Sequence, residues 1–238
     1  AFSARYADAA KLLIDSILDA KRANPSLRVR FFMEGSRSTG AANRETGDRL
    51  KKAGIEVAYG DTHAKSLLVD GIRALVGSTN LTHTSISLNN ETNILVTEES
   101  VVRALSDYFQ KRLDDPSAFH SQTLKFLDGR LTLVLDAAYR AELLDMIRTS
   151  EKSLDVSIYY LQLVNDDGTL REDMGDIAEA LVEARGRNVD IRIYLEQNGE
   201  DFAPHITARN RRSAEYLQSR GIEGVYFDLL GQISHSKY

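Results

Sequence analysis

The sequence contains no cysteine, and this absence excludes disulfide bonds, thiolate metal sites and cysteine nucleophiles. It leaves the compartment open, because a protein without cysteine suits oxidising and reducing surroundings equally. Proline is scarce as well, at 3 of 238 residues, and no run approaches the roughly 18 apolar residues that a membrane span needs. What remains, with 42% hydrophobic and 27% charged residues, is typical of a soluble globular protein. The length suits one large domain or two domains of ordinary size.

An excess of positive charge is also missing. The formal net charge is −5 at pH 7, with 30 Lys and Arg against 35 Asp and Glu. A large nucleic-acid surface usually shows as an excess of Lys and Arg, so the balance argues weakly against one and still allows a local basic cleft. Residues 1–21 carry scattered charges, which a signal peptide does not.

Helix and strand patterns alternate along the first part of the chain, which indicates α/β layers. Apolar residues at helical spacing alternate with short β-rich runs, and Asp70-Gly71 between two such runs predicts a hairpin. The expected elements are helices over 4–23, 43–54 and 100–113, and strands over 27–33, 55–60, 65–70, 73–78 and 92–97.

The same order of elements returns in the second part of the chain. VDIRIYLEQ at 189–197 resembles LRVRFFMEG at 27–35, and the helix and strand that follow each of them are also alike. Each copy then reaches a His-x-Lys, THAK in the first and SHSK in the second. We interpret this as an internal duplication of a domain. The predicted fold is α/β, with two similar halves, each a mixed sheet flanked by helices, packed with pseudo-twofold symmetry.

The two predicted halves, 1–128 and 129–238, are incomplete in complementary ways. The second contains a strand at 154–160 that the first lacks, because the first begins directly with a helix. The first continues past its lysine through Asp70 and Gly-Ser-x-Asn, whereas the second ends one residue after Lys237. We therefore expect this chain to be trimmed at both ends relative to the functional gene product.

The segment 61–82, DTHAKSLLVDGIRALVGSTNLT, carries polar residues at regular spacing. Alternate residues of a strand face the same side, so His63 and Lys65 are expected to project together. The strand that returns from the turn can bring Ser78 and Asn80 to the same face. An imidazole beside an ammonium and a carboxamide, without an acidic cluster, is a poor metal site. It is a good anion site, because Lys and Asn donate to phosphate oxygens.

This pattern resembles the H-x-K-x4-D-x6-G-S-x-N signature of the phospholipase D superfamily. The matching positions are His63, Lys65, Asp70, Gly77, Ser78 and Asn80, and the start of a second motif is matched by His235 and Lys237. SLNNETNILV at 87–96 resembles the segment that follows the signature, in which a glutamate, here Glu91, supports the histidine. The resemblance covers essentially the whole chain as two α/β halves.

The resemblance implies a reaction on a phosphodiester. We expect no metal and no cofactor, because the chain has no cysteine and the motif offers no carboxylate cluster for Mg²⁺ or Zn²⁺. One histidine attacks phosphorus and forms a phosphohistidine, and the other protonates the leaving alcohol. By this analogy His63 is the nucleophile and His235 the general acid, so the two should face each other across a central cleft. The resemblance further implies phosphate binding by Lys65, Lys237, Asn80 and Ser78, and orientation rather than reaction by Asp70 and Glu91.

Three substrate hypotheses remain open. The first is a lipid enzyme, a phospholipase D or a phosphatidyltransferase of the cardiolipin synthase type, working at a membrane surface or the cell envelope. The second is a nuclease, and the third is a non-catalytic relative that binds phosphodiesters. Two motifs in one chain, the presence of Asp70 and the acidic balance favour phospholipid, so nucleic acid is the less favoured partner. Against the lipid hypothesis, no exposed aromatic or amphipathic membrane anchor is evident in the sequence. Hydrolysis or transfer, and the oligomeric state, stay open.

The remaining histidines lack a partner at motif spacing. They are interpreted as surface, loop or structural residues: His83, His120 and His205. Residues 34–47 and 198–212 occupy matching places after equivalent strands, and they either line the substrate entrance or are solvated loops.

Overall fold

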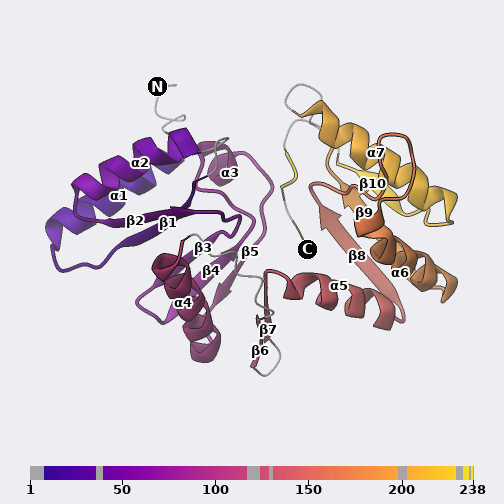
Figure 1. The fold of residues 1–238 in the computed structure, drawn as a ribbon, viewed down its shortest axis with the longest axis horizontal. Helices are drawn as coiled ribbons and strands as arrows, with labels where there is room; N and C mark the ends of the chain where they lie inside the picture. Colours follow the sequence, from indigo (N-terminus) through magenta and orange to yellow (C-terminus); the bar gives the residue numbers. More distant parts are fainter. Residues whose placement is uncertain are drawn as a thin grey trace. The chain divides into compact units, whose positions relative to one another are not determined.

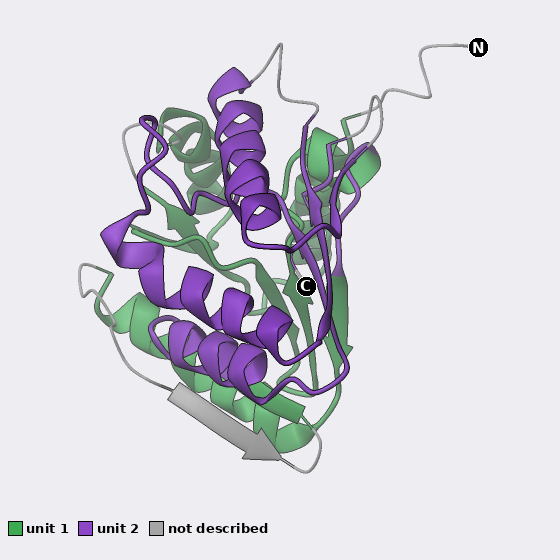
Figure 2. Ribbon diagram, turned by 90° about the vertical axis from the view of Figure 1, so that its right-hand side faces the viewer, with its two compact units in different colours: residues 1–87, 93–121, 126–133 green, residues 88–92, 122–125, 134–238 purple. Residues whose placement is uncertain are grey.

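A computed structural model describes residues 8–35, 40–116, 124–128, 131–197, 203–228, 233–235 and 237. The chain forms two compact units (Figure 2). Unit 1 comprises residues 1–87, 93–121 and 126–133, and unit 2 comprises residues 88–92, 122–125 and 134–238. Unit 2 thus includes the short segment 88–92 from the first half of the sequence. The sequence halves 1–128 and 129–238, and their pseudo-twofold packing, stay predictions.

Unit 1 combines a parallel strand pair with an antiparallel three-stranded sheet. β1 and β2 are parallel, whereas β4 pairs antiparallel with both β3 and β5. The helices are α1 (Ala9–Ala23), α2 (Gly40–Lys52), α3 (His83–Ser87) and α4 (Glu99–Asp114), and the strands are β1 (Arg30–Glu34), β2 (Glu56–Gly60), β3 (Ser66–Val69), β4 (Arg73–Gly77) and β5 (Asn93–Val96). The sequence predicts all of these except the short α3.

Helices cover both faces of the β1–β2 pair (Figure 1). On one face, Ile14 of α1 and Leu50 of α2 are buried together with Ile55, which directly precedes β2. On the other face lies α4, whose Arg112 guanidinium stands 5.1 Å from the ring centre of Phe32 in β1. This layering is the α/β arrangement that the alternating patterns predict.

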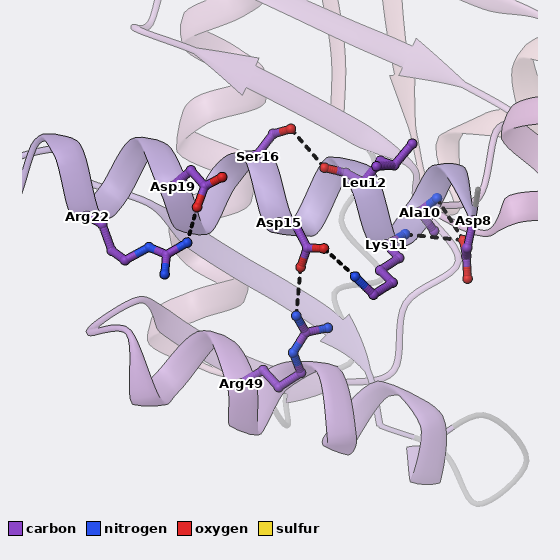
Figure 3. A network of polar contacts seen from close by, with 9 residues as sticks. All are labelled: Asp8, Ala10, Lys11, Leu12, Asp15, Ser16, Asp19, Arg22 and Arg49. Carbon is purple, nitrogen blue, oxygen red and sulfur yellow. Dashed lines mark hydrogen bonds and ion pairs between the residues drawn. The ribbon is translucent and has the colours of Figure 1, made fainter. Parts of the chain in front are cut away.

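The polar end of α1 is built by local side chains (Figure 3). The Asp8 carboxylate caps the helix by accepting hydrogen bonds from the backbone N–H groups of Ala10 and Lys11. Asp15 accepts a hydrogen bond from Lys11 Nζ at 2.6 Å and one from Arg49 of α2 at 2.8 Å. These two cations, Lys11 first, lower the pKa of the Asp15 carboxyl group. The Lys11–Asp15 pair lies within α1, whereas the Arg49–Asp15 pair links α2 to α1; both are partly exposed, so each contributes little to stability.

The β3–β4 hairpin turns where the sequence predicts it. Asp70 and Gly71 both have positive φ, 55° and 68°, and Ile72 N–H donates to the Val69 carbonyl at 3.1 Å. Positive φ at both central positions is what a type I′ turn requires, and Asp-Gly supplies it at little steric cost. The turn returns β4 toward the start of the motif.

Unit 2 is built on a parallel sheet of order β10-β9-β8. Its elements are α5 (Ala138–Thr149), β8 (Ser153–Ile158), the 3-10 helix η2 (Glu172–Met174), α6 (Gly175–Gly186), β9 (Asp190–Leu195), α7 (Pro204–Ser219) and β10 (Val225–Phe227). Alternate residues of β9 point into the core: Ile191, Ile193 and Leu195 are buried with Leu181 of α6 and Leu217 of α7. Two further strands, β6 (Leu124–Asp128) and β7 (Leu131–Leu135), pair with each other and were not expected from the sequence.

The duplication is visible in how the units are built. The order α1-β1-α2-β2 of unit 1 corresponds to α6-β9-α7-β10 of unit 2, and both strand pairs are parallel. The carbonyl of the fully buried Leu50 accepts from Ile55 N–H at 3.1 Å, and that of Leu217 accepts from Ile222 N–H at 3.0 Å. The prediction of two similar α/β halves is therefore confirmed. Among the residues that the structure describes, none of the helices combines the length and apolar character needed to cross a bilayer.

Candidate functional site

The first His-x-Lys lies in the segment between β2 and β3. His63 is exposed, and β3 begins only at Ser66, so His63 and Lys65 precede the strand instead of lying within it. The preceding backbone is fixed by a side chain: Thr62 N–H donates to Glu34 Oε2 at 2.8 Å. Lys65 Nζ turns back and donates to the His63 carbonyl at 2.6 Å. A local hydrogen bond, not strand alternation, thus links the two motif residues.

The β3–β4 hairpin brings the Gly-Ser-x-Asn segment next to Lys65. Gly77 N–H donates to the Lys65 carbonyl at 3.2 Å, which extends the β3–β4 pairing by one step. Ser78 is buried and Asn80 is half-buried. Asn93 Nδ2 then donates to Thr79 Oγ1 at 2.8 Å and ties the segment to β5. The backbone of unit 1 therefore joins Lys65 to the Gly-Ser-x-Asn segment, and the shared face predicted for Ser78 and Asn80 stays a prediction.

Asp70 lies in the turn of the β3–β4 hairpin, where the backbone needs a positive φ. It is exposed at the first of the two positive-φ positions of the turn. An aspartate tolerates this left-handed conformation better than most residues do. Its predicted part in orienting the site stays a prediction.

The second His-x-Lys is held by the segment 88–92 of the same unit. Asn90 N–H donates to the Ile233 carbonyl, and His235 N–H donates to the Asn90 carbonyl, each at 3.0 Å. The His235 ring Nδ1 lies 3.1 Å from Glu91 Oε2, with the two side chains 13% and 6% exposed. A carboxylate only accepts hydrogen bonds, so this contact keeps a proton on Nδ1 and leaves Nε2 to exchange one. Glu91 follows the first motif in sequence, and the structure places it against the histidine of the second.

Tyr159, at the end of β8, completes the surroundings of His235. The two rings meet edge to face with centroids 5.1 Å apart. Lys237 Nζ lies 5.6 Å from the centre of the same tyrosine ring and donates to the His235 carbonyl at 2.6 Å. Burial raises the pKa of the Tyr159 hydroxyl, and the charge of Glu196 raises it further. The tyrosine therefore stays neutral at ordinary pH.

Sequence reasoning missed Tyr159. The signal that could have found it is its place at the carboxyl end of a parallel strand, where sites of open α/β sheets form.

The structure brings the predicted residues together in two groups. In unit 1 it joins His63, Lys65 and the backbone of the Gly-Ser-x-Asn segment, and in unit 2 it joins His235, Lys237 and Glu91. Both groups contain the same 2.6 Å contact from the lysine ammonium to the carbonyl of its histidine.

Of the other histidines, His83 and His205 take no part in either group. His83 Nδ1 accepts a hydrogen bond from Ala9 N–H at 3.3 Å, and His205 is exposed at the start of α7. His120 lies outside the described residues. Within the part of the chain that the structure describes, His, Asp and Glu form no group of three or more that could hold a metal ion.

Comparison with known proteins gives one family match. Residues 4–113 match the model described as the phospholipase D-like domain of cardiolipin synthase. A search of curated proteins finds no match to this chain.

Among solved structures, a polyphosphate kinase from Porphyromonas gingivalis is similar in fold. The TM-score is 0.56 at 15% sequence identity, and the alignment covers 94% of this chain and 35% of that chain. The chain thus spans about a third of the length of the kinase, and at this identity the likeness shows the fold alone.

The first part of the chain is therefore a phospholipase D-like domain. The family match confirms, over residues 4–113, the resemblance to the phospholipase D superfamily that the first motif predicts. A domain of this superfamily indicates phosphodiesterase or transferase chemistry on a phosphodiester substrate.

Proposed function

We propose that the protein cleaves or exchanges phosphodiester bonds of phospholipids through a phosphohistidine intermediate. One observation carries the proposal: each unit holds a His-x-Lys in which the lysine ammonium donates to the carbonyl of the histidine. Two such motifs in one chain supply the two imidazoles that a double displacement at phosphorus needs.

In the first step His63 acts as the nucleophile. An imidazole nitrogen of His63 attacks phosphorus, an N–P bond forms, and the P–O bond to the leaving alcohol breaks. His235 gives its Nε2 proton to the departing alcohol oxygen. The Glu91 carboxylate next to Nδ1 stabilises the charged imidazolium before the transfer.

In the second step the roles of acid and base are reversed. Neutral His235 takes a proton from water, or from a second alcohol, as that oxygen attacks phosphorus. The new P–O bond forms while the N–P bond to His63 breaks, which returns both histidines to their starting states. Water gives hydrolysis and an alcohol gives transfer.

Lysine and asparagine side chains bind the phosphate in this proposal. Lys65 and Lys237 supply positive charge, and Asn80 and Ser78 supply directed donors for the non-bridging oxygens. Such groups matter most where charge develops in the transition state. Glu91 orients His235, and Asp70 shapes the hairpin that carries the donors.

Phospholipid is the substrate class that we propose. The family model that residues 4–113 match carries the name of cardiolipin synthase, an enzyme of lipid phosphodiesters. The net charge of −5 points the same way, because binding to a nucleic acid backbone depends on neutralising its phosphates with excess Lys and Arg.

Parallel assays test the substrate class. A protein with both motifs complete is incubated with phosphatidylglycerol or phosphatidylcholine vesicles and, separately, with single-stranded DNA. We expect headgroup release or exchange on the vesicles, at least tenfold faster than any cleavage of DNA. Cleavage of DNA alone would replace the lipid proposal with a nuclease, and binding of both without cleavage would leave a phosphodiester-binding protein.

Activity is expected to survive removal of metal ions. The proposed reaction uses imidazole as nucleophile and acid, and the motifs offer no carboxylate cluster of the kind that holds Mg²⁺ or Zn²⁺. The measurement is the rate of phosphodiester cleavage before and after incubation with EDTA, which should agree within about twofold. A loss of activity that added metal restores would contradict the phosphohistidine mechanism.

A further inference from the structure

The two units share an arrangement of carboxylates beside the histidine motifs. Glu34 is the last residue of β1, and Glu196 directly follows β9, the equivalent strand. Glu34 Oε2 accepts a hydrogen bond from Thr62 N–H at 2.8 Å, and Glu196 Oε2 accepts one from Ser234 N–H. Thr62 and Ser234 are the residues immediately before the two motif histidines. The same bond thus fixes the same backbone position in both units.

An asparagine of the next helix holds each glutamate in turn. Asn43 Nδ2 in α2 donates to the Glu34 carbonyl, and Asn210 Nδ2 in α7 donates to the Glu196 carbonyl, both at 2.8 Å. Each asparagine lies two helical turns before the fully buried leucine of its helix, so the two are equivalent in the repeat. Strand, helix and motif segment are therefore tied together in the same way twice.

In unit 2 this arrangement is deeply buried. Glu196 is 1% exposed and Asn210 is 0% exposed. Asn210 Nδ2 also donates to the Tyr159 carbonyl at 3.0 Å, and its Oδ1 accepts from Leu161 N–H at 2.8 Å. One amide side chain thus fixes the ends of both β8 and β9. Tyr159 follows β8, and its ring contacts the ring of His235. Glu196 follows β9 and accepts a hydrogen bond from the N–H of Ser234, the residue before His235.

Because Glu196 is buried, the hydrogen bond that its carboxylate accepts from Ser234 N–H is important for stability. A carboxylate taken out of water needs strong donors, because an unsatisfied buried charge is strongly destabilising. A hydrogen bond to a carboxylate is about twice as strong as one between neutral groups. Residues 61–64 belong to no strand, so side-chain hydrogen bonds such as those from Thr62 N–H to Glu34 and from Arg112 to the Asp61 carbonyl fix this backbone.

We propose that Glu34 and Glu196 are positioning residues of the reaction, each setting the place of its motif histidine through the backbone N–H that precedes it. Asn43 and Asn210 keep the two glutamates in place. The proposal rests on the proposed function, which gives the two histidines different roles. Glu34 then positions the nucleophile, and Glu196 positions the general acid.

The different roles predict different defects. In the first step, a displaced nucleophile slows attack on every diester by a similar factor, whereas a displaced acid slows only those reactions whose leaving group needs a proton. The rates compared are therefore those of the first step, measured as release of the phenol in the first turnover. The test uses two aryl phosphodiesters that differ only in the leaving group, p-nitrophenol or phenol. The ratio of the two rates is independent of the fraction of protein that is folded, so partial unfolding does not imitate a change in the ratio. Because E34L is expected to leave the ratio unchanged, its rates are divided by the folded fraction measured by circular dichroism before they are compared.

Four variants and two control variants are compared in a protein with both motifs complete. We expect E34L to lower both rates by roughly 10–100-fold, the scale of a misplacement of about 1 Å, and to keep the wild-type ratio. E196L should raise the ratio of p-nitrophenyl to phenyl rates by about tenfold or more. E34Q and E196Q keep an oxygen acceptor, so we expect them to restore most of the activity. E56L and E223L are the matched controls, because Glu56 and Glu223 are exposed glutamates at equivalent places of the repeat.

Amide hydrogen exchange gives a readout that does not depend on catalysis. E34L should speed exchange at Thr62, and E196L at Ser234, without a comparable change in the control variants. Faster exchange together with the rate changes above supports the positioning role. An active wild type with E34L and E196L rates equal to those of the controls overturns it. A wild type inactive on both esters overturns the proposed function instead, and the catalytic role of the glutamates with it.

Discussion

His63→Ala is expected to abolish both the covalent intermediate and turnover, whereas His235→Ala still forms the intermediate from a diester with a good leaving group. Attack at phosphorus needs the nucleophilic imidazole, so no other side chain replaces His63 in the first step. Departure of p-nitrophenol needs little protonation, so the loss of His235 slows that step without stopping it. The phosphohistidine then accumulates, because the base required for its release is also missing.

The measurement is alkaline quench after incubation with a labelled p-nitrophenyl diester, since the phosphohistidine is labile in acid. The protein used carries both motifs complete, and the mutated proteins are compared at equal concentration with the wild type. Label on His235→Ala and none on His63→Ala supports the assignment. The opposite pattern would exchange the roles of the two histidines, and label on neither would leave a protein that binds phosphodiesters without cleaving them.

Leu217→Ala should lower the free energy of unfolding of unit 2 by about 2–5 kcal/mol, the usual range for a leucine deleted from a core. Leu217 is 0% exposed and packs in the cluster formed by α6, α7 and β9, so the lost side chain leaves a cavity that rigid neighbours cannot fill. The shift of the urea unfolding midpoint measures the effect. The control is Leu12→Ala on α1, where the leucine is 54% exposed, and we expect a change below about 0.5 kcal/mol there. Equal shifts in the two variants would contradict the core that we describe.

Local signals explain why much of the fold could be predicted from the sequence. The Asp70-Gly71 turn depends on the conformational freedom of two adjacent residues, and the hairpin forms as expected. The buried alternation of β9, with Ile191 and Ile193 inward, likewise follows from a period that the sequence displays. The duplication was readable because THAK and SHSK end two similar series of elements.

The support of the motif histidines could not be predicted, because it depends on contacts between residues far apart in the chain. Glu91 lies 3.1 Å from His235, although the sequence associates it with the first motif. Tyr159 and Glu196 contact the second motif from the ends of two strands, and neither contact can be predicted from the spacing of residues in the sequence. His63 and Lys65 were expected to project together as alternate residues of a strand, whereas β3 begins only at Ser66 and the Thr62 N–H before them donates to Glu34.

The membership of residues 88–92 in unit 2 bears on how a duplicated protein can be recombined. A fragment cut at the predicted boundary of the halves, between residues 128 and 129, would carry His235 without Glu91 and without the Asn90 backbone that pairs with Ser234. The two copies are consequently no longer exchangeable modules. Since the carboxylate for the second histidine is encoded before the second copy begins, an exchange of halves between related genes would separate partners that have to be inherited together.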